Sequence, residues 1–411
     1  MSGDRTAFGK ASVRDAPVEG RRALVRVDFN VPLDSDEITD DTRIKAALPT
    51  LELIRERGGA AVCVSHLGRP KGPDPEFSMA PVARRLGQLL DTEVRLAPAV
   101  VGPEVERLAS TLEPGAVMLL ENSRFEPGET ADDPELARGL AELADLYVND
   151  AFGAAHRAHA TTEGVAHHLP AYAGLLLERE VRALTAVRDN PQRPLVVVLG
   201  GAKVSDKVGV IERFLDSAEQ ILIGGAMCFS IFRSQGIAVG DSLVDEESVN
   251  SAGKVLERAE GARADLVLPS DLVLGREFDA ETEIREIDGV EVPDGWMGLD
   301  IGPRTGDGYA SAIAAAGTVF WNGPMGAFEL EPFARGTRRV AQAVAEAPGF
   351  TVVGGGDSAA ALTSFGLADR VDWLSTGGGA SLELMEGKAL PGVDALMDAE
   401  RARDGRPAEA G

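Results

Sequence analysis

The chain has 411 residues, 44% of them apolar, so it is long enough to form two domains with substantial cores rather than one. Its 66 acidic and 41 basic residues give a formal net charge of −25. That charge argues against a nucleic-acid binder and against docking on an anionic membrane, so we expect neither partner.

Short β-branched runs alternate with segments of helical periodicity along the whole chain. The predicted strands are 23–28, 60–65, 116–121 and 146–150 in the first half, then 194–200, 220–225, 264–269, 318–323, 350–356 and 371–377. Helical segments such as 42–58 and 337–349 lie between strands and end in glycine. The fold class is α/β, with two Rossmann-like domains whose parallel sheets are covered by helices on both faces.

The segment 175–194, between the two halves, carries an apolar stripe at helical spacing from Leu177 to Val187. A helix here should end before Pro191. We interpret 176–190 as a connecting helix or hinge between an N-terminal domain, 1–175, and a C-terminal domain, 191–391. An ordinary packing helix within one domain is the alternative.

Polar side chains follow each predicted strand of the first half. The cations among them are Arg26, Arg43, His66, Arg69, Arg124 and Arg157, and Asp28 and Asn30 accompany the first. Ligands of open parallel sheets bind at the carboxyl ends of the strands. Because arginine binds phosphate and carboxylate groups bidentately, this edge predicts a pocket for a small, multiply anionic, hydroxylated molecule. The histidines lack metal-ligand spacing, so we interpret His66 as a hydrogen-bond donor rather than a general base.

The strands of the second half end in glycine, in "GGAKVSDK" (200–207), "GGAM" (224–227), "WNGPMGAFE" (321–329), "GGGDS" (354–358) and "STGGGAS" (375–381). Glycine lets backbone N–H groups approach phosphate oxygens, and a helix N-terminus adds positive potential. Lys203 and Lys207 lie beside the first of these turns, and Asp357 suits Mg²⁺ coordination. There is no G-x-x-x-x-G-K-[ST] and no G-x-G-x-x-G after the first strand, so the pattern predicts a nucleotide site that is neither a P-loop nor a dinucleotide fingerprint.

Long motifs in one order make the chain resemble the phosphoglycerate kinase family nearly from end to end. They include "LVRVDFNVP", "DDTRI", "SHLGRP", "ENSRF", "NDAFGAAHRAHA", "LGGAKVSDK", "GWMGLDIGP", "WNGPMGAFE", "GGGDS" and "STGGGASLELMEGKALPGV". The resemblance implies reversible transfer of a phosphoryl group from 1,3-bisphosphoglycerate to MgADP, giving 3-phosphoglycerate and MgATP in glycolysis and gluconeogenesis. It also implies that the segment 392–411 returns to the N-terminal domain.

The resemblance assigns site residues to both domains. In the N-terminal domain the substrate residues are Arg26, Asp28, Phe29, Asn30, Arg43, His66, Leu67, Gly68, Arg69, Arg124 and Arg157. In the C-terminal domain the nucleotide residues are Gly201, Lys203, Lys207, Gly225, Gly298, Asn322, Pro324, Glu329, Gly355, Gly356, Asp357 and Ser358, with Asp357 orienting Mg²⁺. The departures are small: Ser123 stands where valine is common in the family, and Ser358 where threonine is common.

The expected chemistry needs no general base, because the acceptor in the reverse direction is a carboxylate that is ionised at pH 7. We therefore expect catalysis by positioning and charge stabilisation, with Arg43, Lys203 and the backbone amides of Gly378 and Gly379 on the transferring group. Closure of the domains about the connecting helix would expel water. The alternatives are another acyl-phosphate kinase, or a non-catalytic binding protein on the same fold.

The acidic surplus itself has two interpretations. Lysine occurs only seven times, and arginine carries most of the positive charge. One hypothesis is a halophilic surface whose self-repulsion is screened by salt, and the other is a merely acidic mesophilic protein.

Cysteine usage and the N-terminal sequence indicate a cytoplasmic protein. Cys63 and Cys228 lie far apart within apolar runs, which predicts buried free thiols rather than a disulfide. The start "MSGDRTAFGK" lacks the apolar core of a signal peptide, and no apolar run approaches the roughly 20 residues that span a bilayer. No surface stripe calls for a partner subunit, so we expect a monomer.

Overall fold

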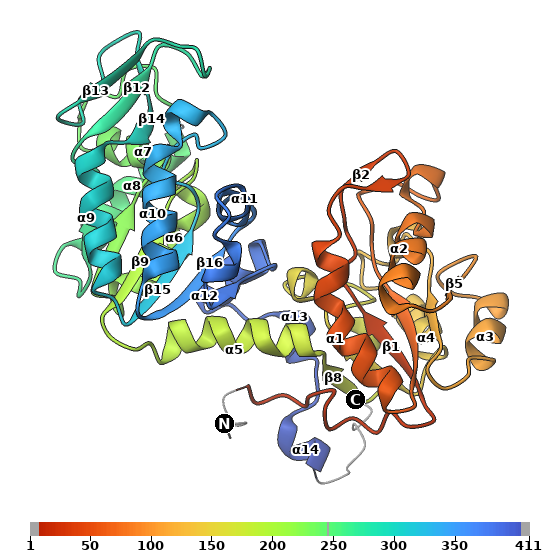
Figure 1. The fold of residues 1–411 in the computed structure, drawn as a ribbon. Helices are drawn as coiled ribbons and strands as arrows, with labels where there is room; N and C mark the ends of the chain where they lie inside the picture. The colour runs from red at the N-terminus through yellow and green to blue at the C-terminus, as the bar shows by residue number, and fades with distance from the viewer. Residues whose placement is uncertain (1–7, 245, 404–411) are drawn as a thin grey trace. The chain divides into compact units, whose positions relative to one another are not determined.

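The computed structural model describes residues 8–244 and 246–403 (Figure 1). The chain divides into two compact units: unit 1 comprises Met1–Arg182 and Ala389–Gly411, and unit 2 comprises Ala183–Lys388. Most of the N-terminal stretch inspected for a signal peptide lies outside the described residues, as does the 404–411 part of the segment expected to return.

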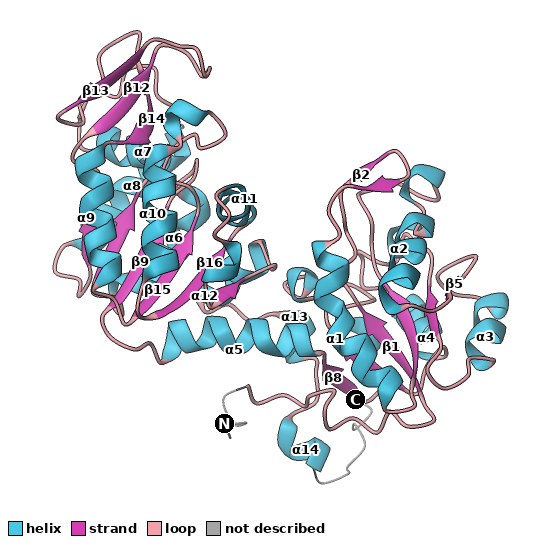
Figure 2. Ribbon diagram, viewed as in Figure 1, coloured by secondary structure: helices cyan, strands magenta, loops and turns pink. Residues whose placement is uncertain are grey.

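Unit 1 is built on a six-stranded parallel sheet with the order β5-β6-β4-β1-β7-β8. Its strands are β1 (Arg22–Arg26), β4 (Ala60–Val64), β5 (Val94–Leu96), β6 (Val117–Leu119), β7 (Leu146–Asn149) and β8 (Ala171–Ala173). Its longer helices are α1 (Thr42–Glu56), α2 (Ala80–Leu90), α3 (Pro103–Ser110) and α4 (Pro134–Ala141) (Figure 2). Every residue of β4 is buried, as expected for a parallel strand covered on both faces.

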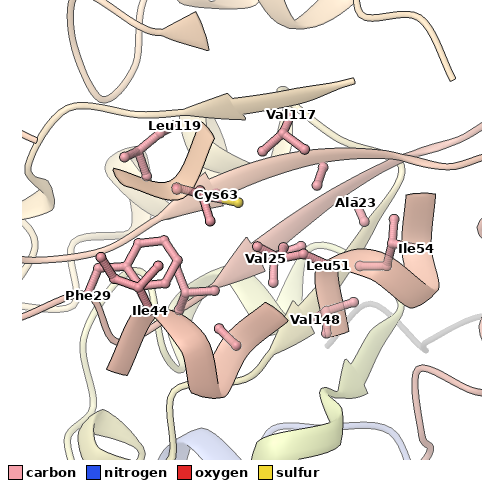
Figure 3. Packing of buried hydrophobic residues seen from close by; sticks show 14 of the residues in the cluster. Ala23, Val25, Phe29, Ile44, Leu51, Ile54, Cys63, Val117, Leu119 and Val148 are labelled. Carbon is pink, nitrogen blue, oxygen red and sulfur yellow. The ribbon is translucent and has the colours of Figure 1, made fainter. Parts of the chain in front are cut away.

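One apolar core of unit 1 lies between the sheet and α1. Figure 3 shows Val25 of β1 and Cys63 of β4 packed near Ile44 and Leu51 of α1. Ile44, Leu51 and Ile54 recur at helical spacing, so one stripe of α1 faces the sheet. Full burial of such a side chain contributes roughly 1.5–3 kcal/mol to the free energy of folding. This packing holds α1 against the strands and so limits the positions of the loops that connect them.

Unit 2 repeats the plan with the strand order β11-β10-β9-β15-β16-β17, again all parallel. The strands are β9 (Leu195–Leu199), β10 (Gln220–Ile223), β11 (Asp265–Val267), β15 (Thr318–Asn322), β16 (Phe350–Gly354) and β17 (Trp373–Leu374). The helices are α6 (Val208–Leu215), α7 (Met227–Ser234), α8 (Glu246–Ala259), α9 (Pro303–Ala314), α10 (Arg335–Glu346), α11 (Gly356–Ser364) and α12 (Gly379–Glu386). The predicted α/β class and parallel sheets are confirmed.

Unit 2 also contains a small antiparallel sheet, β13-β12-β14, that the strand pattern did not predict. Its strands are β12 (Leu272–Gly275), β13 (Ile284–Ile287) and β14 (Met297–Ile301). Ile284 is 45% exposed, and β13 as a whole lacks a buried face. Without a buried face, a strand shows no alternation of apolar and polar residues for sequence analysis to find.

The long helix α5 (Leu175–Asp189) begins in unit 1 and ends in unit 2, since the boundary between the units falls after Arg182. The described end of the chain, with α13 (Pro391–Asp394) and α14 (Ala399–Arg403), belongs to unit 1. There Met397 N donates to the carbonyl oxygen of Ala171 in β8 at 3.0 Å, and Asn149 Nδ2 donates to the carbonyl oxygen of Gly392 at 2.9 Å.

Both cysteines are free and buried, which confirms the prediction of buried thiols. Burial raises the pKa of the Cys63 thiol to about 12, so it is protonated at neutral pH. Across residues 8–244 and 246–403, none of the helices combines the length and the apolar character required to traverse a bilayer.

The N-terminus of α4 gives a local test of the fold. Asp133 Oδ1 accepts hydrogen bonds from the backbone N–H groups of Glu135 and Leu136 at 2.9 and 3.0 Å. Asp133→Ala should therefore lower the free energy of unfolding of unit 1 by about 1 kcal/mol, whereas Asp133→Ser keeps a capping oxygen and should stay within a few tenths. Urea unfolding followed by circular dichroism checks the difference, and equal stability of the two variants would contradict the cap.

Candidate active site

The polar residues predicted in unit 1 lie at one edge of its sheet. The four strands that precede them, β6, β4, β1 and β7, are neighbours and parallel, so their carboxyl ends meet there. Asn30 Oδ1 accepts a hydrogen bond from Gly68 N at 2.8 Å and so joins the loops after β1 and β4. The strand itself ends at Arg26, two residues earlier than predicted, and Asp28 and Asn30 lie in the loop.

Arg43 and Asp28 form an ion pair at this edge. Arg43 Nη1 lies 2.5 Å from Asp28 Oδ2, and the Arg43 side chain remains 39% exposed. Burial opposes ionisation of Asp28, but the charges of Arg43, His66 and Arg26 outweigh it and hold the pKa of Asp28 below its ordinary value. The Arg43 guanidinium group is therefore held by Asp28 on one side and accessible to solvent on the other.

Arg26 is buried behind the edge. Its Nε donates to Thr161 Oγ1 at 2.9 Å, its Nη1 to the carbonyl oxygen of Val27, and its Nη2 lies 3.1 Å from His66 Nδ1. Only 1% of Arg26 is exposed. A direct contact of Arg26 with substrate stays a prediction. In the structure, Arg26 contacts the side chains of Thr161 and His66.

His66 is neutral at physiological pH. Burial and the neighbouring charge of Arg26 lower its pKa to about 3. Phe29 and Leu67 beside it are buried apolar side chains, so only their backbone groups are suited to a polar ligand. These features fit the expectation of a hydrogen-bonding histidine.

Three further arginines converge on the same edge. The pKa of Arg124 is lowered by partial burial and by the charges of Arg157 and Arg69, whose guanidinium groups act on it from the same edge. Arg124 Nη1 also donates to the carbonyl oxygen of Gly68 at 3.2 Å, and Arg69 is exposed. Cations gathered in this way need an anion, and a phosphate or carboxylate supplies one.

The glycine turns of unit 2 are held against one another by backbone hydrogen bonds. Gly201 N donates to the carbonyl oxygen of Pro324 at 3.0 Å, and Gly225 N donates to that of Met325 at 2.8 Å. Gly225 has φ +69°, and a Cβ there would lie 2.4 Å from Gly201 N. The loops after β9, β10 and β15 can approach this closely only because the side chains are missing.

A cavity of about 820 Å³ lies beside these turns. Six predicted nucleotide residues line it: Gly201, Gly225, Gly298, Pro324, Glu329 and Asp357. Gly298 packs against Phe229, since a Cβ on Gly298 would lie 2.0 Å from the ring. The mainly apolar wall with carboxylates at Glu329 and Asp357 is typical of a site for a flat, partly polar ligand.

Lys207, Asn322 and Ser358 form a buried polar cluster near the end of β15 and are not among the residues that line the cavity. Lys207 Nζ donates to Asn322 Oδ1, and Gly323 N donates to Ser358 Oγ at 2.6 Å. Burial lowers the pKa of Lys207 to about 8. Among the described residues, Asn322 Nδ2 is a buried donor without a hydrogen-bond partner.

The remaining predicted residues lie at helix N-termini or in the open. Lys203 is exposed and does not line the cavity. Gly356 is the first residue of α11 and follows Gly355, whose φ is +92°. Gly379 begins α12, and Gly378, with φ +53°, precedes it. The two helix starts present backbone N–H groups, which favour anions.

Comparisons with known proteins give one consistent result. The sequence profile described as "Phosphoglycerate kinase" matches residues 13–388. The chain is 54% identical over 400 residues to the phosphoglycerate kinase of Chloroflexus aggregans, covering 96% of this chain and 100% of that protein. It is 55% identical over 392 residues to the one of Rubrobacter xylanophilus, covering 95% and 99%. The chain belongs to the phosphoglycerate kinase family.

Solved structures of phosphoglycerate kinases superpose on the fold of this chain and so agree with its family. The phosphoglycerate kinase of Coxiella burnetii superposes with a TM-score of 0.87 at 41% identity, covering 96% of this chain and 100% of that one. The enzyme of Pyrococcus horikoshii gives 0.83 at 31% identity with the same coverage. The resemblance predicted from the motifs is confirmed, and the chain is a phosphotransferase.

Two residues that the sequence analysis did not single out connect the loops at the arginine-rich edge of unit 1. Asn122 Oδ1 accepts from Leu67 N at 3.2 Å, while its Nδ2 donates to the carbonyl oxygen of Leu67 at 2.8 Å. Ser65 Oγ accepts from Phe29 N at 2.9 Å. Both residues belong to motifs that were singled out, but their partners lie 55 and 36 positions away in the chain, so no local signal indicates these hydrogen bonds.

Unit 2 offers the carboxylate of Asp357 for a Mg²⁺ ion that would also be bound by nucleotide phosphates. Among the described residues, no three His, Cys, Asp or Glu side chains gather as metal ligands. Mg²⁺ commonly binds through one or two carboxylates together with substrate phosphates rather than in a protein cage. Asp357, exposed in the first turn of α11 and on the cavity wall, suits such a shared site.

Proposed function

We propose that the chain transfers a phosphoryl group reversibly from the acyl phosphate of 1,3-bisphosphoglycerate to the β-phosphate oxygen of MgADP, giving 3-phosphoglycerate and MgATP. The bond between the carboxyl oxygen and phosphorus breaks as the new bond to ADP forms. The observation that carries the proposal is the gathering of Arg43, Arg124, Arg157 and Arg69 at one sheet edge of an acidic protein. This combination suits a small molecule with a phosphate and a carboxyl group.

In unit 1, the glycerate would bind where its groups match the side chains present. Asp28 and Asn30 suit the hydroxyl group, and the cluster of Arg69, Arg124 and Arg157 suits the distal phosphate. Arg43, anchored by Asp28, is free to reach the group in transfer. Phe29, Leu67 and Gly68 would contribute through their backbone.

In unit 2, the nucleotide would lie in the cavity. The apolar wall at Gly298 and Phe229 suits the base, and Glu329 suits the ribose hydroxyls. The turns at Gly201 and Gly225, with the amides at the start of α11, suit the phosphates.

The transfer itself needs charge rather than a base. The carboxylate of 3-phosphoglycerate is already ionised, and His66 is neutral. We assign Arg43, Lys203 and the backbone N–H groups of Gly378 and Gly379 to the developing charge of the phosphoryl group. Mg²⁺, when bound, would neutralise charge on the nucleotide phosphates. Closure about α5 is our proposal for how the two substrates meet.

Asp357→Ala should raise the Mg²⁺ concentration that gives half-maximal activity about tenfold, because one metal ligand is lost while the nucleotide phosphates still bind the ion. A Mg²⁺ titration at saturating ADP measures the shift, with Asp369→Ala, an exposed carboxylate outside the cavity, as the control. An unchanged titration would remove Asp357 from the metal site.

Binding of ADP at pH 8 should take up a fraction of a proton. The free Lys207 amine has a pKa of about 8, and an anionic phosphate nearby favours the charged form, so its pKa rises on binding. Affinity should therefore weaken as the pH rises through 8 and 9. Calorimetry in buffers of different ionisation enthalpy measures the uptake, which Lys207→Met should abolish; uptake that persists in this variant would contradict the assignment.

The assay that tests the function couples 3-phosphoglycerate and MgATP to removal of the acyl phosphate, in a series of KCl concentrations. We expect turnover with 3-phosphoglycerate and none with acetate or other simple carboxylates. Turnover only with another acid would favour a different acyl-phosphate kinase, and no turnover would favour a non-catalytic binding protein.

Three finer properties are part of the proposal. The glycolytic reaction supports a cytoplasmic location. The absence of any apolar surface stripe in the sequence supports a monomer, which sedimentation would test. The charge of −25 supports a salt-adapted surface, and full activity and stability in dilute buffer would contradict it.

A further inference from the structure

A buried carboxylate lies behind the arginine edge of unit 1 and has no part in the chemistry described so far. Glu129 is in the loop between the 3₁₀ turn Ser123–Phe125 and α4, and 1% of it is exposed. Its Oε1 accepts from Thr161 Oγ1 at 2.6 Å and from Ser123 Oγ at 3.3 Å, and its Oε2 accepts from Thr161 N at 3.1 Å. A buried charge is costly unless it is paired, so its position needs a reason.

Thr161 connects this carboxylate to Arg26. The Thr161 hydroxyl has one proton, which it donates to Glu129, and its oxygen accepts from Arg26 Nε at 2.9 Å. Since Thr161 is fully buried, water does not compete for either bond. The Glu129 carboxylate thus fixes the direction in which the Thr161 hydroxyl proton points. The hydroxyl lone pair that remains then accepts from Arg26 Nε and orients the guanidinium group of Arg26.

Arg26 in turn fixes the tautomer of His66. A guanidinium nitrogen is always a donor, so His66 Nδ1, 3.1 Å from Arg26 Nη2, must be the acceptor and carries no proton. The proton of the neutral ring is then on Nε2, the one ring nitrogen left for a ligand. Glu129 also accepts a hydrogen bond from Ser123, the residue that precedes Arg124 in the chain.

We propose that Glu129 is a positioning residue that acts through Thr161 and Arg26 to present His66 as an Nε2–H donor toward the anionic substrate. The geometry of the four residues stands on the structure alone, and the identity of the substrate as 3-phosphoglycerate rests on the proposed function. Removal of the Thr161 hydroxyl should free Arg26 Nε, let the guanidinium group turn, and release His66 Nδ1.

The test uses the full chain and the variant Thr161→Val, with Thr130→Val, an exposed neighbour of Glu129, as the matched control. Nitrogen-15 NMR of the histidine rings, with His66 assigned from His66→Gln, reads the tautomer without substrate. We expect a protonated Nε2 and a bare Nδ1 in the wild type and in Thr130→Val, and a mixture of tautomers in Thr161→Val. Glu129→Gln should give the same mixture, if it folds.

Steady-state kinetics supply the second readout. Thr161→Val should raise KM for 3-phosphoglycerate about tenfold and leave KM for ATP unchanged, a split that a general loss of stability would not produce. A wild-type tautomer in folded Thr161→Val would overturn the proposal, and so would a changed tautomer with an unchanged KM. If the wild type does not turn over 3-phosphoglycerate at all, the proposed function fails, while the NMR result still decides whether Glu129 positions His66.

Discussion

Replacing Arg43 by alanine should lower kcat by about 10³-fold while changing KM for 3-phosphoglycerate far less, because a guanidinium group that meets the transferring phosphoryl group stabilises mainly the transition state. The structure favours this role for Arg43 over Arg26. Arg26 is buried with its nitrogens engaged, whereas Arg43 is anchored by Asp28 on one side and 39% exposed. Initial rates at saturating ATP and varied 3-phosphoglycerate measure the effect.

Two variants make the Arg43 result interpretable. Arg43→Lys keeps the charge but loses the planar pair of donors, so it should recover only part of kcat. Arg107→Ala, on the exposed face of α3 with its side chain 66% exposed, should behave like the wild type. A raised KM with near wild-type kcat in Arg43→Ala would mean that Arg43 binds the ground state and does not take part in the transfer.

Lys203→Ala should lower kcat by roughly 10²–10³-fold, the usual cost of removing one donor from a developing oxyanion. Lys203 is exposed at the turn after β9, outside the wall of the nucleotide cavity, so its amine is free to reach a phosphoryl oxygen and contributes little to holding the base. KM for ATP should therefore change much less than kcat. Single-turnover measurements at saturating ligand separate the two effects.

Lys254 gives the matched control for Lys203. It is an exposed lysine of the same unit, on α8, and does not line the cavity. Lys254→Ala should leave kcat unchanged. Equal small losses in the two variants would show that Lys203 acts only through the overall charge of the acidic protein, and the assignment to the phosphoryl group would be abandoned.

The sequence was informative about the parallel sheets because short β-branched apolar runs such as 195–199 are typical of strands that are covered on both faces. It was also informative about the sheet edge, since the ends of β1, β4 and β6 bring Arg26, His66 and Arg124 close together whatever the details of the loops. It was silent on β13, whose residues are largely exposed and have no alternation. The glycine-rich turns indicated a close backbone approach, and Gly225 against Gly201 N shows it.

The supporting residues could not be predicted, because their partners are distant in the chain. Glu129 meets Thr161 across 32 positions, and Asn122 meets Leu67 across 55. Nothing local distinguishes Glu129 from the many exposed glutamates of an acidic chain. For the same reason, the sequence did not indicate that Arg26 is buried, and its direct contact with substrate stays a prediction.

Hydrogen–deuterium exchange of the full chain with each ligand alone tests most directly where the two substrates bind. 3-Phosphoglycerate should protect peptides around Asn30, Arg43 and His66 and leave unit 2 unchanged, and MgADP should protect peptides around Gly201, Gly225 and Asp357 and leave the arginine edge unchanged. Protection of the peptides beside Arg26 and His66 by MgADP, or of the glycine turns by 3-phosphoglycerate, would contradict the assignment of one substrate to each unit.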